Sequence, residues 1–109
     1  MKALKPVNRE KTRYVLLELI GLKKITSKEI SLINKFLEEK FGYFDYAKSF
    51  LSVKDSSSKK NSSFIIYQIN RKYLDLFTSS IVLLQKIGNI KVQPVVKLVS
   101  GSIKKVKDD

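Results

Sequence analysis

The 109-residue sequence contains no cysteine, no histidine and no tryptophan. Without cysteine the chain has no disulfides, no thiolate nucleophile and no cysteine-ligated metal site. Without histidine it lacks the general base and the metal ligand that proteins use most often. These absences exclude every nucleophilic mechanism built on cysteine or histidine.

Carboxylates are also scarce, with ten Asp and Glu residues in the chain. Glu38 and Glu39 are neighbours in a predicted helix and therefore point about 100° apart. Asp108 and Asp109 fall in a predicted C-terminal tail. A metal-dependent nuclease needs carboxylates that converge on Mg²⁺, and no such pair is apparent. We therefore expect no catalytic residue, no metal site and no cofactor bound by the protein itself.

Long apolar runs are missing as well. No stretch approaches the roughly 18–20 apolar residues that a membrane-spanning helix requires. Residues 1–6 contain two lysines and reach a proline before an apolar segment can form, so no secretory signal is predicted. We expect a cytoplasmic protein that does not associate with membranes.

The main positive feature is charge. Twenty-two Lys and Arg residues stand against ten Asp and Glu, which gives a net charge of +12 and a pI near 9.9. A field of this sign attracts polyanions, among which nucleic acid is favoured over an acidic protein or an anionic membrane. The alternative is a lysine-rich surface that serves only solvation.

The first half of the chain predicts a basic arm over residues 1–11, a strand over 12–20 and a helix that ends at Gly42. Thr26 and Glu29 have the spacing of a capping box at the start of that helix. Its apolar stripe consists of Ile30, Ile33, Leu37 and Phe41.

The second half predicts further strands and one more helix. In chain order, we expect a strand over 45–54, a flexible hairpin loop over 55–63, a strand over 64–69, a helix over 71–87 and a strand over 90–99. Asn70 is the predicted cap of the second helix and Gly88 its stop. Pro94 indicates that part of the last strand lies at a sheet edge or bulge.

The order β-α-β-β-α-β predicts an α+β fold of the ferredoxin-like class, an RNA-recognition-motif-like α/β sandwich. We expect an antiparallel sheet with two helices on one face and the other face free. Residues 1–109 form a single predicted domain, with a basic arm over 1–11, a globular core over 12–103 and a tail over 104–109.

This fold does not by itself assign a function. An acylphosphatase-like hydrolase needs a glycine-rich loop after the first strand, where residues 21–25 contain one glycine. A free-standing RNA-recognition-type binder of single strands places aromatics two apart on its third strand. Phe64 and Tyr67 are three apart and so point to opposite faces, which leaves Tyr14 to stack alone. This binder remains the main alternative and would be favoured by aromatics of strands one and three on one open face.

Three stretches carry a family resemblance. KTRYVLLELI, KFGYFDYAKS and VVKLVSGSIKK resemble, in order and spacing, the archaeal ribonuclease P protein component 2 family, a small α/β-sandwich subunit. Ser102 replaces the threonine of the family's last motif, and Asp45 stands where a small residue or glycine is usual.

The resemblance implies a subunit of ribonuclease P, the complex that removes 5′ leaders from precursor tRNA. In that family the RNA subunit performs the hydrolysis, so Mg²⁺ is expected only for the RNA. The protein binds and stabilises the catalytic RNA together with a larger barrel-shaped protein subunit and other subunits of the complex. A homodimer is a further assembly that stays open.

The expected RNA-binding residues lie near both ends of the chain. They are Arg9, Lys11, Arg13, Tyr14, Ser100, Gly101, Ser102, Lys104 and Lys105. Gly101 permits a positive φ, and free amides beside the two serines would form an anion-binding nest. The lysines would add charge as an extended chain leaves the sheet.

A protein-partner surface is also expected, because large exposed apolar patches mark interfaces. The candidates on the predicted helices are Phe36, Leu76, Leu83 and Ile87. The competing interpretation is that these residues only widen the core.

Overall fold

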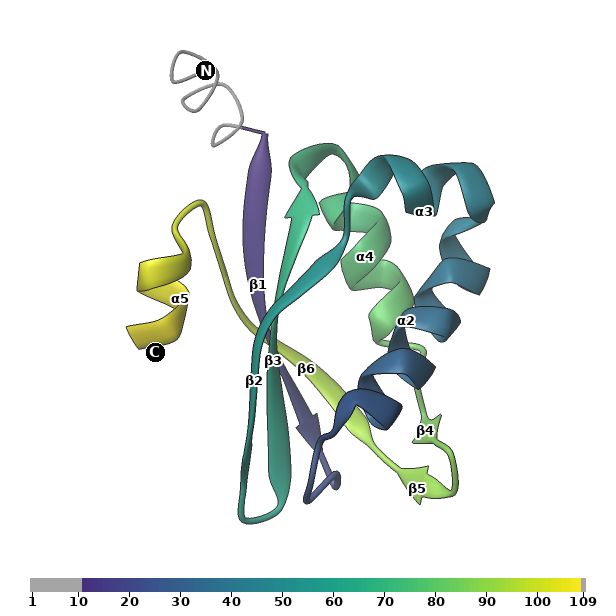
Figure 1. The fold of residues 1–109 in the computed structure, drawn as a ribbon, viewed down its shortest axis with the longest axis vertical. Coiled ribbons are helices and arrows are strands. Elements are labelled where there is room, and N and C mark those ends of the chain that lie inside the picture. Colours follow the sequence, from purple (N-terminus) through teal and green to yellow (C-terminus); the bar gives the residue numbers. More distant parts are fainter. Residues whose placement is uncertain (1–10, 109) are drawn as a thin grey trace.

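The computed structural model describes residues 11–108, and the side chains of residues 11–107. Arg9 and most of the predicted basic arm therefore lie outside the described residues. Strands β1 (Thr12–Ile20), β2 (Ser52–Lys59), β3 (Ser62–Asn70) and β6 (Gln93–Ser100) form one antiparallel sheet in the order β2-β3-β1-β6 (Figure 1). This arrangement confirms the predicted ferredoxin-like α+β fold.

Two helices, α2 (Ser27–Phe41) and α4 (Leu74–Ile81), cover one face of the sheet (Figure 1). We call this the helix face. Its core is built from alternate residues of the strands and the apolar stripes of the helices. The buried members are Val15, Leu17, Leu19, Leu22, Ile33, Leu37, Phe41, Ile65, Tyr67, Ile69, Phe77, Ile81, Leu84, Ile87 and Val92. The apolar periodicity of the sequence predicted most of this core, though not Ile87.

The start of α2 is the predicted capping box. The Glu29 carboxylate accepts a hydrogen bond from the Thr26 N–H at 2.8 Å and another from the Thr26 hydroxyl. These hydrogen bonds to the Thr26 side chain and backbone lower the pKa of Glu29. Gly42 ends the helix with φ 88°, a conformation that favours glycine.

The predicted strand over 45–54 is wrong in its first half. Residues Tyr43–Ser49 form a short helix, α3, and the strand begins only at Ser52. The Tyr46 N–H donates to the Gly42 carbonyl at 2.9 Å. The Tyr46 ring packs edge-on against the Phe41 ring, with 6.0 Å between the two ring centres. The glycine turn and this aromatic contact favour a second helical segment over an early strand.

The predicted flexible loop over 55–63 is also wrong. Strand β2 continues to Lys59, and strand β3 begins at Ser62. The sequence has no apolar residue there because this end of the edge strand β2 is exposed. Backbone ladder hydrogen bonds hold the hairpin, and the buried Ser63 hydroxyl donates to the Leu22 carbonyl at 2.7 Å.

The second helix is shorter than predicted. The Asn70 side chain accepts from the Lys72 N–H at 3.0 Å, so the predicted cap is confirmed, and a 3₁₀ turn η1 (Arg71–Tyr73) leads into α4. After α4 the chain forms a small hairpin of β4 (Lys86–Ile87) and β5 (Ile90–Lys91) around Gly88. Pro94 lies in β6, which is an edge strand as expected.

The second face of the sheet is not free. Residues Ile103–Asp108, most of which were predicted as a tail, form helix α5, which packs on this face (Figure 1). We call this the α5 face. Val106 is buried against Leu16 and Ile66, and Ile103 packs at the margin of the same cluster. Ile103 and Val106 are three residues apart, so one helical turn brings both onto the sheet.

Candidate RNA-binding surface

The two predicted basic stretches meet at one end of the sheet. Strand β1 pairs with β6 so that Tyr14 lies opposite Ser100. A side chain at Gly101 would begin 3.7 Å from the Arg13 guanidinium, so these segments are in contact although they come from opposite ends of the chain. The antiparallel pairing of the first and last strands creates this juxtaposition.

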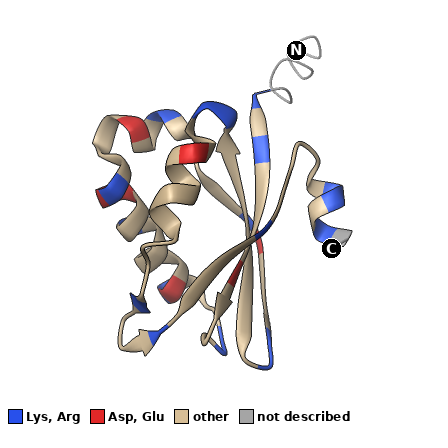
Figure 2. Cartoon of the chain, turned by 180° about the vertical axis from the view of Figure 1, so that it is seen from behind, with Lys and Arg blue, Asp and Glu red and all other residues tan. Residues whose placement is uncertain are grey.

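These two segments carry five basic side chains, which we call the basic edge: Lys11, Arg13, Lys104, Lys105 and Lys107. Residues 11–14 and 100–107 include no acidic residue. Figure 2 shows the basic residues along the start of β1 and on α5. The four lysines are exposed, while Arg13 is half-buried and donates to the Thr12 carbonyl at 2.8 Å. The basic edge can therefore present several cations to one polyanion.

The Ser-Gly-Ser turn differs from the expected anion nest. The Ser100 hydroxyl accepts a hydrogen bond from the Ser102 N–H at 3.1 Å, which occupies that amide. Gly101 does not have a positive φ, in contrast to Gly21, Gly42 and Gly88. The absence of a side chain at Gly101 instead leaves space beside the Arg13 guanidinium. The Ser102 amide is therefore not free to bind an anion in the way that the expected nest requires.

The two predicted lysines lie on a helix and not on an extended segment. Lys104 and Lys105 are both exposed on α5 and point about 100° apart. Ile103 anchors α5 on the sheet. Both side chains therefore reach solvent on different sides of α5, and each adds positive charge to the field of the basic edge.

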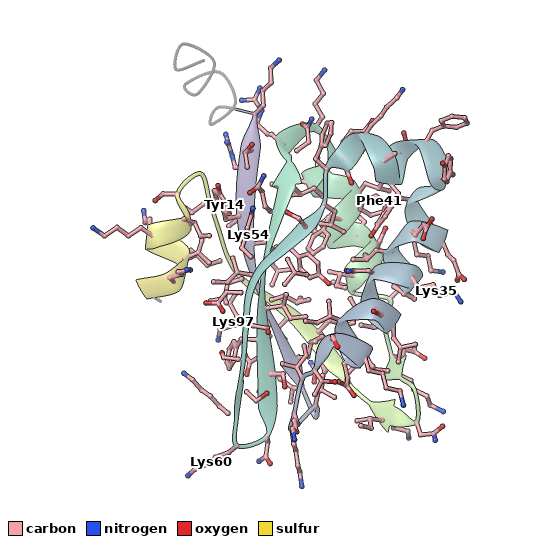
Figure 3. All side chains as sticks on the ribbon, viewed as in Figure 1. Tyr14, Lys35, Phe41, Lys54, Lys60 and Lys97 are labelled. Atoms are coloured by element: carbon pink, nitrogen blue, oxygen red, sulfur yellow. The ribbon has the colours of Figure 1, made fainter. Side chains whose placement is uncertain are left out.

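Tyr14 has a different environment from the lysines. It is half-buried at the margin of the cluster on the α5 face and projects to the side where α5 lies (Figure 3). Phe64 of β3 belongs to the same cluster, whereas Tyr67 is fully buried on the helix face. Aromatics of strands one and three therefore do share a face, but Val106 covers its centre and is 1% exposed. This face is not the open stacking surface of a single-strand binder.

A hollow of about 290 Å³ remains between the β2–β3 hairpin and α5. Phe64, Ile66 and Val106 contribute to its apolar lining, and Lys59 and Lys107 belong to its polar rim. The Lys59 ammonium lies 5.2 Å from the centre of the Phe64 ring, so a cation covers this aromatic.

Two further cations, Arg71 and Lys72, lie beside the basic edge and were not among the predicted residues. The Arg71 N–H donates to the Lys11 carbonyl at 2.6 Å, which places η1 next to the start of β1. Arg71 and Lys72 are both exposed there. The signal was available, because a basic pair directly follows the predicted cap Asn70.

The predicted partner residues fall into three environments. Ile87 is 3% exposed and belongs to the core, so the expectation of an exposed contact is wrong for this residue. Phe36 and Leu76 are half-buried and pack against the same core. Only Leu83 is prominently exposed, at 57%. Of the predicted set, only Leu83 is prominently available to a partner.

The acidic residues and Gly21 bear on the alternative of a hydrolase. Within residues 11–108, no three His, Cys, Asp or Glu residues are grouped to hold a metal ion. The single glycine after β1, Gly21, donates its N–H to the Asn61 carbonyl at 2.8 Å, and a side chain there would come within 2.6 Å of the Lys91 carbonyl. Gly21 therefore serves the packing of the β5 segment. None of the helices in this described part is long and apolar enough to span a bilayer.

The chain matches the profile of the Rpp14/Pop5 family over residues 13–109, a region that begins in β1 and includes α5. No curated protein matches it. The match covers nearly the whole chain, and the chain belongs to the Rpp14/Pop5 family of ribonuclease P protein subunits. This finding agrees with the family resemblance carried by the three sequence motifs.

Proposed function

We propose that this ribonuclease P subunit is a non-catalytic RNA-binding protein that supports the RNA of the complex in removing 5′ leaders from precursor tRNA. The observation that carries the proposal is the basic edge, where residues 11–14 and 100–107 from opposite ends of the chain supply five cations and no acidic residue. Membership in a ribonuclease P protein family supplies the identity of the polyanion.

The proposed mechanism is electrostatic. Exposed lysines at the basic edge neutralise phosphates and release condensed counterions, which favours compact folding of the RNA. Arg13 adds a planar guanidinium whose position is restricted by its hydrogen bond to the Thr12 carbonyl. In this proposal Mg²⁺ is held by the RNA, and a larger barrel-shaped protein subunit works beside this chain.

The second candidate function is single-strand binding on the α5 face. Tyr14 and Phe64 favour it because they share that face. Helix α5 would have to leave the sheet before a base could stack there, since Val106 covers the centre of the face. We therefore place RNA at the basic edge.

The experiment compares two pairs of neighbouring exposed lysines. Lys104→Ala with Lys105→Ala removes two charges from the basic edge, and the matched control Lys23→Ala with Lys24→Ala removes two from the loop after β1. In binding to the cognate ribonuclease P RNA, the first variant is expected to reduce the slope of log K against log salt by about 1–2. The control should leave the slope near that of the wild type.

Reconstituted cleavage of precursor tRNA supplies the functional readout. The wild-type chain should increase processing by the RNA with the other subunits, and the Lys104/Lys105 variant should do so less at elevated salt. Equal slopes and equal processing for the two variants would contradict the proposal.

A further inference from the structure

The most exposed large apolar side chains of the described residues are three aromatics on or beside α3. Tyr43 is 73% exposed, Phe44 76% and Phe50 72%. Tyr43, Ala47 and Phe50 follow the i, i+4, i+7 spacing that places residues on one side of a helix. Phe44 extends this side through an edge-to-face contact with Tyr43 at 5.6 Å. We call these four residues the α3 stripe.

The stripe is held outward by contacts on the opposite side of α3. Tyr46 packs against Phe41, and the buried Ser49 hydroxyl donates to the Tyr46 carbonyl at 2.6 Å. The same hydroxyl accepts from the Leu51 N–H at 3.3 Å. The helix then ends at Phe50 with φ 51°, the only positive φ of a non-glycine residue among those described. The backbone thus fixes the rings in solvent.

The charge around the stripe argues for a protein partner. None of its four residues is charged, and residues 38–50 contain three acidic and two basic residues, in contrast to the uniformly basic edge. RNA contacts depend on clustered cations, whereas the centre of a protein interface is enriched in aromatics and depleted of charge. A helix with anchors at i, i+4 and i+7 fits an apolar groove.

The size of the stripe argues against a second copy of this chain. An aromatic side chain buries about 150–250 Å², so three that are about three-quarters exposed offer roughly 350–550 Å². A stable interface needs about 800 Å² from each partner. Two such stripes pressed together would fall short of this area, whereas a groove that also covers the flanks of α3 would bury more.

We propose that the α3 stripe docks in an apolar groove of another protein subunit of the ribonuclease P assembly. This inference rests on the proposed function, which supplies that assembly. It assigns protein contact to Tyr43, Phe44 and Phe50 and leaves RNA contact to the basic edge.

The test compares two sets of exposed apolar side chains. The stripe variant carries Tyr43→Ser, Phe44→Ser and Phe50→Asn, because asparagine tolerates the left-handed conformation at position 50. The control carries Val82→Ser and Ile90→Ser, which lie just after α4 and in β5 and are 56% and 44% exposed. Binding of each chain to the other ribonuclease P protein subunits of the same organism, each purified singly, is measured by calorimetry without RNA.

The stripe variant should lose affinity for one subunit on the order of 100-fold, the effect of removing an interface hot spot. Phe44→Ser alone should give a smaller loss in the same direction, and the Val82/Ile90 control should bind as the wild type does. Wild-type affinity in the stripe variant overturns the inference. A loss confined to RNA affinity, or to self-association seen in sedimentation, overturns it equally.

Processing assays separate this inference from the proposed function. The docking site alone is refuted if the wild-type chain supports processing and the stripe variant binds every subunit normally. The proposed function alone is refuted if the wild-type chain has no effect on processing and the stripe variant loses subunit binding. The docking site is then still supported.

Discussion

The two faces of the central sheet are buried in different ways. The helix face carries a core shared by the strands, α2, α4 and the β4–β5 region. On the α5 face the fully covered cluster consists of Leu16, Ile66 and Val106, and one helix of six residues covers it. Removal of a helix-face contact should therefore affect the whole fold, while removal of an α5 contact should release one element locally.

The largest expected effect is on the helix face. Phe77 is fully buried and its ring lies 5.4 Å from that of Tyr67. Phe77→Ala should lower the free energy of unfolding by about 3–5 kcal/mol, through lost burial and the cavity that remains. Urea denaturation followed by circular dichroism measures this loss. Exposed Phe44, changed to Ala, serves as the control and should stay within about 0.5 kcal/mol of the wild type.

A smaller and local effect is expected on the α5 face. Val106→Ala removes two methyl groups from a site that is 1% exposed, which should cost about 1–2.5 kcal/mol. Hydrogen exchange should accelerate at the amides of α5 and remain slow in α2, because α5 can open alone. Uniform acceleration in both helices would show that the two faces unfold as one unit.

The same difference explains how far the fold could be predicted. Val15, Leu17 and Leu19 alternate over a long strand and predict the helix face directly. Helix α5 has only Ile103 and Val106 as apolar anchors, too few to define a helical period. The α3 segment was misassigned because residues 45–54 also alternate, and a few residues do not distinguish the two periods.

For the candidate site, residue types were predictable and local geometry was not. The β-α-β-β-α-β order brings the basic residues after position 100 beside Arg13 through antiparallel pairing. The hydrogen bond from the Ser102 N–H to the Ser100 hydroxyl and the helical placement of Lys104 depend on tertiary contacts. The exposure of Phe50 likewise follows from α3, which was predicted as a strand.

A third experiment sharpens the comparison through pH. The Tyr67 hydroxyl donates to Asn34 Oδ1 at 2.9 Å, and burial raises the pKa of Tyr67 well above its usual value of about 10. Tyr67→Phe should cost about 1 kcal/mol near neutral pH through loss of this hydrogen bond. In the wild type the unfolded state alone releases the proton above about pH 10, so this contribution to stability is present below pH 10 and lost above it.

The stability difference between wild type and Tyr67→Phe should therefore narrow as pH rises through 10, because phenylalanine has no proton to release. Urea midpoints from pH 8 to 11 measure the difference. A difference that stays constant across this range would show that Tyr67 ionises in the folded state as easily as in the unfolded state.

The smallest expected effect comes from two matched cation–π pairs. Lys59 lies 5.2 Å from the centre of the Phe64 ring at the α5 face, and Lys40 lies 5.4 Å from that of Phe36 on α2. Each lysine is exposed and each ring is half-buried, so each pair should contribute about 0.5–1 kcal/mol. Double-mutant cycles with Lys→Met and Phe→Leu at each site isolate the two coupling energies. Equal coupling energies would show that the two surface pairs are equivalent. The difference in stability between the two faces would then come from their buried areas. A coupling at Lys59 that exceeds the one at Lys40 by more than about 0.5 kcal/mol would show that this pair helps to hold the α5 face closed.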